Sequence, residues 1–318
     1  MRIGLDVMGG DRAPDATIRG AILAHKTLGE QHKIVLIGDQ TAIRNKLDEL
    51  ESDSVPFEIV HAEQTIDMSE NPTKAFKLKP QSGINIGFQL LKKGEIDAFA
   101  SAGNSGAMLV GSMYSVQAVK GIARPATAAI FPRQDGGNNI ILDVGTNVDS
   151  KPEHLFQSAT LSYPSAHPVL LVDAPRVGLL SIGEEKEKGN AATKAAHKLF
   201  EQSKTFNFIG NVEGRDLLRN NVDVIVCDGF TGNVVLKQTE AFFRIMTKRG
   251  LTDDYLARFN YENYGGTPVL GVNAPVLLGH GISNDIAVKN MILHAVDVTK
   301  ADLPSKIESS VLKNFQND

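Results

Sequence analysis

The strongest constraint on the fold is a local pattern that recurs along the chain. In each copy a short apolar run ends in a loop rich in Gly, Asn, Ser, Thr and Asp, and these loops span Met8–Asp11, Ser101–Ala107, Gly145–Asp149 and Asp228–Thr231. In an open α/β sheet, ligands bind beyond the carboxyl ends of the strands. We therefore expect these loops to line one shared polar cleft.

The clearest copy lies in Val222–Lys237. Val222–Cys227 is apolar except for Asp223, which is typical of a strand buried on both faces. Asp228–Thr231 should form a four-residue loop, and Gly232-Asn233 should open a helix. The free N–H groups and the dipole at a helix start favour an anion, most often a phosphate. A tight strand–helix turn that binds nothing is the alternative for this loop taken alone.

Strand and helix periodicities alternate along most of the chain, which predicts a mostly parallel sheet with helices on both faces. The expected strands are Arg2–Val7, Lys33–Gly38, Phe57–His61, Ala98–Ser101, Thr127–Phe131, Ile140–Val144, Val177–Ile182, Asn207–Ile209 and Val222–Cys227. The expected helices are Pro14–Leu28, Thr41–Leu50, Gly83–Lys92, Gly106–Val119, Asn190–Glu201, Asn233–Thr247 and Ile286–Lys300. A further helix from Pro152 should end near Ser162, because Pro164 and Pro168 follow and an interior proline costs about 3 kcal/mol. Arg249–Asn263 predicts a surface loop or a short hairpin.

The composition indicates a soluble globular protein, with 318 residues, 42% hydrophobic residues and a net charge of −4. This mild acidity, without a basic block, argues against a nucleic-acid partner. The length fits one α/β domain or two tightly coupled ones. We expect a single catalytic domain over residues 1–318, with a smaller dimerisation subregion around residues 235–275.

Several features favour a cytoplasmic location. No apolar stretch approaches the roughly 20 residues that span a bilayer. Met1-Arg2 leads straight into a strand, so we expect no signal peptide. The single cysteine, Cys227, excludes an intramolecular disulfide and fits a reducing compartment. Because Cys227 lies in a predicted buried strand, we do not expect it to be a nucleophile.

The chain lacks the motifs HExxH, GxSxG, GxxxxGK[ST] and GxGxxG, so we expect no metal and no cofactor. The cations that could neutralise a bound phosphate are Arg176, Lys186, Lys188 and Arg215. Lys188 stands out because Gly189-Asn190 follows it at a helix start, although a solvated turn is the alternative for this lysine cluster. His280 lies in a loop of small residues. Its role is that of a proton donor, a phosphate ligand or a structural histidine, and the sequence leaves these alternatives open.

Long sequence blocks in a fixed order carry a resemblance that covers nearly the whole chain. The blocks are Asp6–Asp11, Ser101–Ala107, Leu142–Leu155, Pro175–Leu180, Gly183–Asn190, Asn211–Asp216, Asp228–Asn233, Tyr264–Gly266 and His280-Gly281. Together they resemble the phosphate acyltransferase (PlsX) family of bacterial phospholipid synthesis. The resemblance implies a three-layer α/β/α sandwich with a mostly parallel, Rossmann-like sheet, related to phosphotransacetylases and to isocitrate and isopropylmalate dehydrogenases.

The resemblance also implies a reaction and its partners. A homodimer would transfer a long-chain fatty acyl group from acyl carrier protein to inorganic phosphate, without a cofactor. The product, acyl phosphate, would serve a membrane acyltransferase. Many relatives carry a longer apolar and basic helical hairpin before the Tyr-Gly-Gly motif, which is associated with docking to the membrane. This chain is shorter there, so peripheral membrane contact should be weak. The segment Tyr163–Asp173 also departs from the family pattern.

Residue chemistry suggests roles within these blocks. Phosphate is already an anionic nucleophile, so the site must chiefly position it and stabilise an oxyanion. The catalytic candidates are Lys188 and Arg176 for charge neutralisation, His280 for protonating the thiolate, and Asn233. The candidates for binding phosphate and substrate are Gly9, Gly10, Asp11, Ser101, Gly103, Asn104, Ser105, Gly106, Asn147, Asp228, Gly229, Thr231 and Gly232.

Three other functions compete with this interpretation. A phosphotransacylase acting on short acyl-CoA would carry similar loops. A metal- and NAD-dependent decarboxylating dehydrogenase would need converging carboxylates, for which Asp143, Asp149 and Asp228 are the candidates, without a matching spacing. A non-catalytic scaffold for phospholipid synthesis would not need the glycine and cation blocks.

Overall fold

The structure, a computed structural model, describes residues 1–52, 55–170 and 172–315. Its residues form two compact units, each drawn from two separate segments of the chain. Unit 1 comprises Met1–Gln117 and Tyr261–Asp302, and unit 2 comprises Ala118–Asn260 and Leu303–Asp318. Because the chain leaves each unit and returns to it, no single linker marks the division.

Unit 1 contains six strands and six α-helices among the described residues. Its elements are β1 (Arg2–Asp6), α1 (Asp15–Leu28), β2 (Lys33–Gly38), α2 (Gln40–Glu49), β3 (Glu58–His61), α3 (Pro72–Leu78), α4 (Gly83–Lys93), β4 (Ala98–Ser101), α5 (Ser105–Gly111), β10 (Gly266–Leu270), β11 (Val276–Gly279) and α10 (Asp285–Lys300). The strands lie in the order β3-β2-β1-β4-β11-β10. All are parallel except β10, which runs antiparallel to β11.

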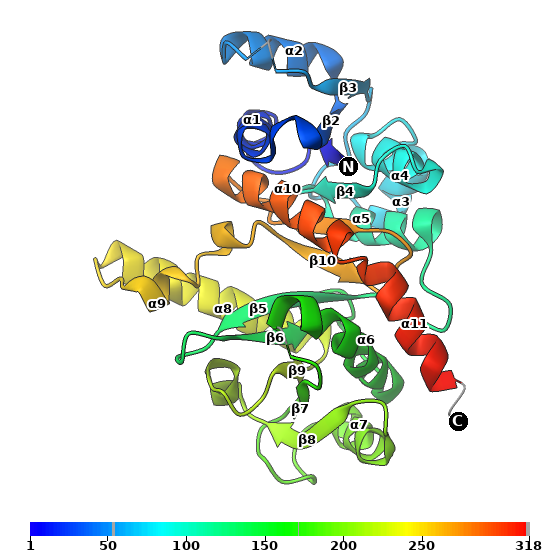
Figure 1. Ribbon diagram of the computed structural model, residues 1–318, viewed down its shortest axis with the longest axis vertical. Coiled ribbons are helices and arrows are strands. Elements are labelled where there is room, and N and C mark those ends of the chain that lie inside the picture. The colour runs from blue at the N-terminus through cyan, green and yellow to red at the C-terminus, as the bar shows by residue number, and fades with distance from the viewer. Residues whose placement is uncertain (53–54, 171, 316–318) are drawn as a thin grey trace. The chain divides into compact units, whose positions relative to one another are not determined.

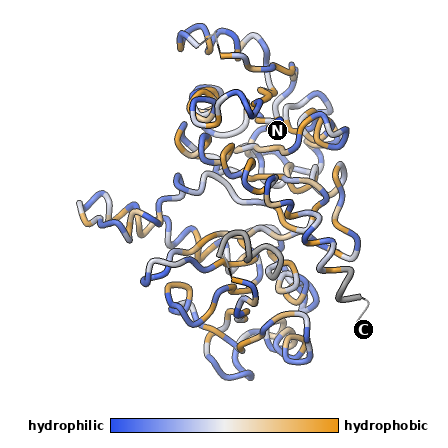
Figure 2. The backbone as a smooth tube through the Cα atoms, in the orientation of Figure 1, coloured by the Kyte–Doolittle hydropathy of each residue, from blue (hydrophilic) through white to orange (hydrophobic). Residues whose placement is uncertain are grey.

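Alternate residues of the unit 1 strands enter two separate cores. Ile34 and Leu36 of β2 pack with α1 and α10, which lie side by side in Figure 1. Val35 and Ile37 of the same strand pack with α4 and α5. Because neighbouring side chains of a strand point to opposite faces, helices cover both sides of this sheet. The helices of Figure 2 alternate hydrophilic and hydrophobic residues along their length, as burial of one helix face requires.

Unit 2 repeats this architecture. Its elements are β5 (Ala126–Pro132), β6 (Asn138–Leu142), α6 (Pro152–Leu170), β7 (Arg176–Leu180), α7 (Ala191–Gln202), β8 (Asn207–Val212), β9 (Val224–Val226), α8 (Gly229–Lys248), α9 (Asp254–Ala257) and α11 (Leu303–Phe315). The strand order is β5-β6-β9-β7-β8, and only β5 is antiparallel to its neighbour. Helices α6 and α7 pack on the strands and α11 packs on α6, while Val235 and Leu236 of α8 join a second core.

The predicted α/β class with a mostly parallel sheet is confirmed, and every predicted strand exists with boundaries shifted by at most a few residues. Some element predictions were wrong. Helix α8 begins at Gly229, so Asp228–Thr231 is not a loop, and α5 ends at Gly111 with a π-helical turn at Ser112–Val116 instead of continuing to Val119. Helix α6 continues to Leu170, past the expected end near Ser162. Buried Leu155, Ala159 and Leu161 anchor its first half.

The sequence reading also missed several elements. Strands β10 and β11 and helices α3 and α11 were not predicted, and Arg249–Asn263 contains the short helix α9 and a 3₁₀ turn. Of the atypical segment Tyr163–Asp173, residue 171 lies outside the described residues. No helix in the described part of the chain is long and apolar enough to cross a membrane.

Candidate active site

Three loops of unit 1 meet at the carboxyl ends of the adjacent parallel strands β1, β4 and β11. The Asp11 N–H donates to the Gly281 carbonyl over 2.7 Å, which joins the first loop to the third. A Cβ added at Gly9 would lie 2.7 Å from the Gly103 nitrogen, so the first and second loops touch through their backbones. The structure thus brings Gly9, Gly10, Asp11 and Gly103 together, as the sequence predicted for loops at strand ends.

Two predicted ligand-binding side chains of unit 1 instead hold the loops in place. Ser101 is 1% exposed, and its hydroxyl donates to Asp6 Oδ2 over 2.7 Å. Asn104 is 6% exposed; its Oδ1 accepts the Ala107 N–H, and its Nδ2 donates to the carbonyls of Asp67 and Glu70. Neither side chain has a donor left for phosphate.

The remaining unit 1 candidates have different surroundings. Ser105 opens α5 and is exposed. Gly106 follows it, and a Cβ there would lie 2.8 Å from the Pro72 ring, so this glycine allows α3 and α5 to pack closely. The His280 ring is half-buried and stacks edge-on against Tyr261, with 5.0 Å between ring centroids. The unit 1 candidates that retain exposure are therefore Gly10, Asp11, Ser105, Gly106 and His280.

Unit 2 has its own group of loops, at the carboxyl ends of the adjacent strands β6, β9 and β7. The loop after β6 is organised by Asp143, which is 1% exposed and accepts five hydrogen bonds. The donors are the backbone N–H groups of Thr127, Thr146 and Asn147, the Thr127 hydroxyl and the Asn147 side-chain amide. Asn147, a predicted ligand, is thus bound to Asp143 and to the Pro125 carbonyl.

The predicted anion site at the start of α8 is already occupied by protein groups. Asp228 caps the helix: Oδ1 accepts the Thr231 N–H over 2.8 Å, and Oδ2 accepts the Thr231 hydroxyl over 2.9 Å. The Gly229 N–H donates to the Asn147 carbonyl, and the Gly232 N–H to the Asp228 carbonyl. A carboxylate at this helix start provides the negative charge that a phosphate would otherwise supply. Among the backbone N–H groups of residues 229–232, only that of Phe230 is left to donate to a ligand.

Asn233 and Lys188 are the unit 2 candidates that remain available. Asn233 is half-buried and lies over Gly145, since a Cβ added at Gly145 would be 3.6 Å from Asn233 Oδ1. Lys188 is exposed in the loop that follows β7, and no carboxylate of the described residues pairs with its ammonium group. Arg215, by contrast, pairs with Glu184 and Glu213. Lys188 is therefore a cation free to bind an anion at this edge of the unit 2 sheet.

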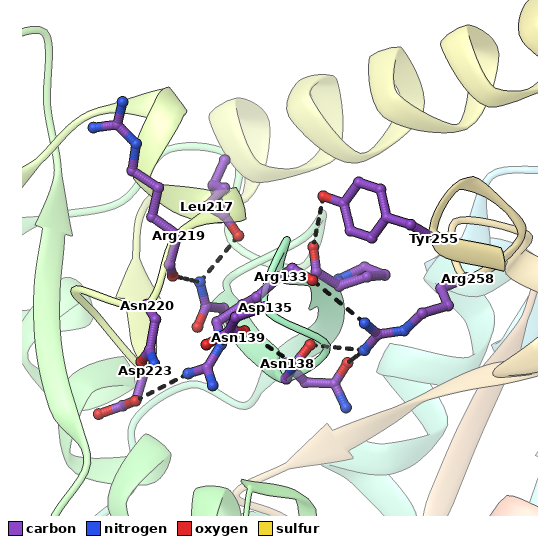
Figure 3. Close-up of polar contacts among 12 residues, drawn as sticks. Arg133, Asp135, Asn138, Asn139, Leu217, Arg219, Asn220, Asp223, Tyr255 and Arg258 are labelled. Carbon is purple, nitrogen blue, oxygen red and sulfur yellow. Dashed lines mark hydrogen bonds and ion pairs between the residues drawn. The ribbon is translucent and has the colours of Figure 1, made fainter. Parts of the chain in front are cut away.

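Arg176 lies at the opposite end of the sheet from these loops. It is the first residue of β7, and its guanidinium donates to both carboxylate oxygens of Asp223 over 2.8 and 2.9 Å. The Arg176 guanidinium also donates to the carbonyl and side-chain oxygens of Asn220. Arg133 lies 3.6 Å from the same aspartate, as Figure 3 shows. The fork of Arg176 is committed to a structural ion pair, which argues against the predicted role in neutralising phosphate.

Replacing Arg176 with methionine is expected to lower stability without changing turnover. Burial raises the pKa of Asp223, but hydrogen bonds from the side chain and backbone of Arg176 outweigh it and hold the pKa below its ordinary value. The pair therefore stabilises the fold above the unfolded pKa of about 3.9, and this contribution is lost as pH falls through the lower folded pKa. We expect a loss of about 1–3 kcal/mol at neutral pH that shrinks in acid, measured by urea unfolding. The exposed Arg44→Met is the control. Unchanged stability with reduced turnover would return Arg176 to the site.

The other titratable and metal-ligating groups bear on the competing functions. Burial, with Asp228 and Asp143 nearby, raises the pKa of the Cys227 thiol well above its ordinary value, which disfavours a thiolate nucleophile. Asp143 and Asp228 are bound to backbone and hydroxyl donors. Within residues 1–52, 55–170 and 172–315, no three His, Cys, Asp or Glu side chains form a group that could hold a metal ion.

Sequence reasoning missed the residues that organise both loop groups. The sequence singled out Asp6 only as part of a motif, and Asp143 only as part of a motif and as a candidate metal ligand. Each follows or ends an apolar strand just before a glycine-rich loop, and such a carboxylate is buried and must find donors. An acidic residue at the carboxyl end of a buried strand, or directly after it, was therefore the sequence signal that could have identified Asp6 and Asp143.

Comparison with known proteins gives a consistent result. The model of a family described as "Fatty acid synthesis protein" matches residues 1–306. A phosphate acyltransferase from Halothermothrix orenii is 40% identical, with 99% of each chain covered. Another from Pelotomaculum thermopropionicum is 41% identical, covering 98% of this chain and 95% of the relative.

Solved structures with the same fold are more distant in sequence. A phosphotransacetylase (EutD) from Staphylococcus aureus superposes with a TM-score of 0.62 at 15% identity, covering 95% of this chain and 94% of the other. A branched-chain phosphotransacylase from Enterococcus faecalis V583 gives 0.62 at 14% identity, covering 94% and 99%. These likenesses concern the fold, whereas the full-length sequence matches concern the family. This chain belongs to the phosphate acyltransferase family.

Proposed function

We propose that this protein transfers a long-chain acyl group from acyl carrier protein to inorganic phosphate, in a reversible reaction. The observation that carries the proposal is the match to phosphate acyltransferases at about 40% identity over nearly the whole chain. The free Lys188 cation and the glycine-rich loops at the strand ends support it. A cation and exposed backbone at these loops suit a reaction whose nucleophile is an anion.

The reaction needs positioning more than activation. A phosphate oxygen attacks the thioester carbonyl carbon, an oxyanion forms, and the carbon–sulfur bond breaks to release acyl phosphate and the carrier thiolate. Phosphate needs no general base, so holding it beside the carbonyl supplies most of the rate. The thiolate takes up one proton.

We assign these tasks chiefly to candidates that keep exposed surface. In unit 2, Lys188 neutralises the phosphate, and the Asn233 amide donates a hydrogen bond to phosphate or to the oxyanion. In unit 1, the backbone of Gly10 and Asp11 and the Ser105 residue contact substrate, and His280 protonates the departing thiolate. Ser101, Asn104, Asn147, Asp228 and Thr231 act by shaping the loops.

The test is phosphate-dependent release of the carrier thiol. Purified protein is incubated with palmitoyl-acyl carrier protein, with and without phosphate, and free thiol and acyl phosphate are measured. We expect both products only when phosphate is present. A parallel reaction with acetyl-CoA tests the short-chain phosphotransacylase. Activity with acetyl-CoA and none with the carrier would contradict the proposal.

Replacing Lys188 with alanine is expected to lower kcat/KM for phosphate by roughly a hundredfold or more, because one positioned cationic donor is lost from the transition state. The matched control is Lys186→Ala, which removes another exposed lysine from the same loop. Initial rates over a range of phosphate concentrations make the comparison. Equal rates for Lys188→Ala and Lys186→Ala would remove Lys188 from the proposed site.

We also propose that the protein forms a homodimer through α8. Its exposed apolar residues Phe230, Val234, Phe242 and Ile245 follow the helical repeat and form one stripe, each at least half exposed. An apolar stripe of this length is usually covered by a partner. Phe242→Glu should convert a dimer into a monomer in light scattering, whereas Ile286→Glu on α10 should not.

An anionic membrane surface competes with the partner subunit for this stripe. Arg244 and Lys248 are exposed on the same helix and would suit an anionic surface. We propose weak contact of this kind, and no stable association with a membrane acyltransferase is needed for the reaction itself. Co-sedimentation with vesicles containing anionic lipid tests it: binding that Phe242→Glu does not weaken would contradict a role for α8.

A further inference from the structure

The Asp6 carboxylate lies beneath the unit 1 loops without a charged partner. It ends β1 and is 3% exposed. Ser101 donates its hydroxyl proton to Oδ2 over 2.7 Å, and the Met8 N–H donates to Oδ1 over 3.3 Å. In the described part of the chain, no cation pairs with this carboxylate. An ionised group in such surroundings depends on its hydrogen bonds.

Backbone from three loops closes around the same carboxylate. A Cβ added at Gly9 would lie 2.6 Å from Oδ2, and one added at Gly83, at the start of α4, would lie 2.5 Å from Oδ1. A Cβ at Gly103 would lie 3.3 Å from Oδ2. The Ile37 carbonyl of β2 is also near Gly83. The Ser101 hydroxyl of β4, the Gly83 backbone of α4 and the nearby Ile37 carbonyl of β2 carry no charge.

Asp6 is the end of a hydrogen-bond chain that reaches the loop after β4. The Ser101 hydroxyl donates to Asp6 and accepts the Gly103 N–H over 3.0 Å. A hydroxyl has one proton, so an ionised Asp6 fixes that proton and leaves a lone pair for Gly103. A protonated Asp6 has an O–H group that can itself donate to the Ser101 hydroxyl. The direction of the hydrogen bonds between Asp6, Ser101 and Gly103 is then no longer fixed.

We propose that Asp6 is a positioning residue for acyl transfer: in its ionised form it fixes the Ser101 hydroxyl and, through it, the Gly103 amide, so that the loop Ser101–Ser105 keeps its working shape. The proposal rests on the function proposed above and deepens it. It assigns Asp6 no contact with substrate.

The charge state of Asp6 changes within the range of a pH profile. Burial raises its pKa to about 6, although the hydrogen bonds from Ser101 and Met8 act in the other direction. Because the folded pKa exceeds the unfolded value of about 3.9, the ionised group destabilises the fold as pH rises through this interval. Asp6→Asn removes that effect. Activity and stability should therefore respond in opposite directions, which a purely structural residue would not show.

The experiment compares the full-length protein with Asp6→Asn, Ser101→Ala and the double variant between about pH 5 and about pH 8. Phosphate itself titrates near neutrality, so the ratio of wild-type to variant kcat/KM is used, in which that titration cancels. We expect a ratio of roughly tenfold for Asp6→Asn at the alkaline end that falls toward one at the acid end. The Asp6→Asn unfolding temperature at the alkaline end should equal or exceed that of the wild type. The double variant should be no slower than Ser101→Ala.

Several results would overturn the proposal. These are a ratio independent of pH, effects of the two substitutions that multiply, or a fall in activity matched by a fall in unfolding temperature. NMR gives a test without turnover: the Asp6 carboxyl carbon and the Gly103 amide should titrate together in the wild type, and the amide should not in Ser101→Ala. Independent titrations would also overturn it. A wild type without phosphate-dependent release at any pH would instead contradict the proposed function, while the NMR titration still decides the hydrogen-bond chain.

Discussion

Replacing Gly232 with alanine is expected to unfold the loop group of unit 2 and abolish acyl transfer. The added methyl group would overlap the Asp143 carbonyl oxygen and lie 2.9 Å from the Cys227 sulfur. Both neighbours are held in the buried ends of β6 and β9, so α8 must move instead. Overpacking against fixed groups lowers the free energy of unfolding by about 1–3 kcal/mol and occasionally more. Because the contact here is with backbone, which cannot move aside, we expect a loss at the upper end of this range.

The sign of this effect makes it diagnostic. A glycine-to-alanine change inside a helix normally stabilises by about 1 kcal/mol, whereas we expect a clear loss here. The control is Gly214→Ala, where the added methyl group meets no atom within 4 Å. Urea unfolding gives the stability change, and kcat/KM for phosphate gives the functional one, because Asn233 follows directly in α8. A Gly232→Ala protein as stable as Gly214→Ala would show that α8 is not fixed against β6.

The positions of the loops were predictable from sequence, whereas the use of their hydrogen-bond donors was not. Apolar runs located the strands, and parallel order brings their carboxyl ends to one edge. The helix start at Gly229 depends on Asp228 accepting the Thr231 N–H, which a capping rule predicts but the apolar period does not. The Arg176–Asp223 pair joins residues far apart in the chain, across neighbouring strands, and no local pattern reveals it.

The missed strands have a local cause. Strand β10 contains Pro268 and begins at Gly266, and both residue types argue against a strand when only the sequence is read. Pairing with β11 overrides that preference, since Gly266 lies opposite Gly279 and Thr267 opposite Leu278. The pairing is an outcome of tertiary structure. The pairing also places His280 directly after the end of β11, whereas the sequence analysis placed this histidine only in a loop.

Removing the Asp143 carboxylate is expected to have the second large effect. Asp143→Ala would leave five buried or half-buried donors without their acceptor, and each unsatisfied buried donor costs about 1–3 kcal/mol. Local rearrangement and water will satisfy some of them, so we expect a net loss of roughly 3 kcal/mol or more. The loop Gly145–Asn147 should lose its shape, and the Asn147 contact with Gly229 should go with it.

The conservative replacement separates charge from shape. Asp143→Asn keeps the volume but turns one acceptor oxygen into a donor that faces either the Asn147 N–H groups or the Thr127 and Thr146 donors. We therefore expect a stability loss between those of Asp143→Ala and the control, the exposed Asp149→Asn of the same loop. Equal stability of Asp143→Asn and Asp149→Asn in urea would mean that the loop does not need the negative charge. Because Gly229 and Gly232 both pack against the segment that Asp143 organises, stability and phosphate-dependent turnover should fall together in this series. That joint fall distinguishes Asp143 from Asp6, for which the two should separate.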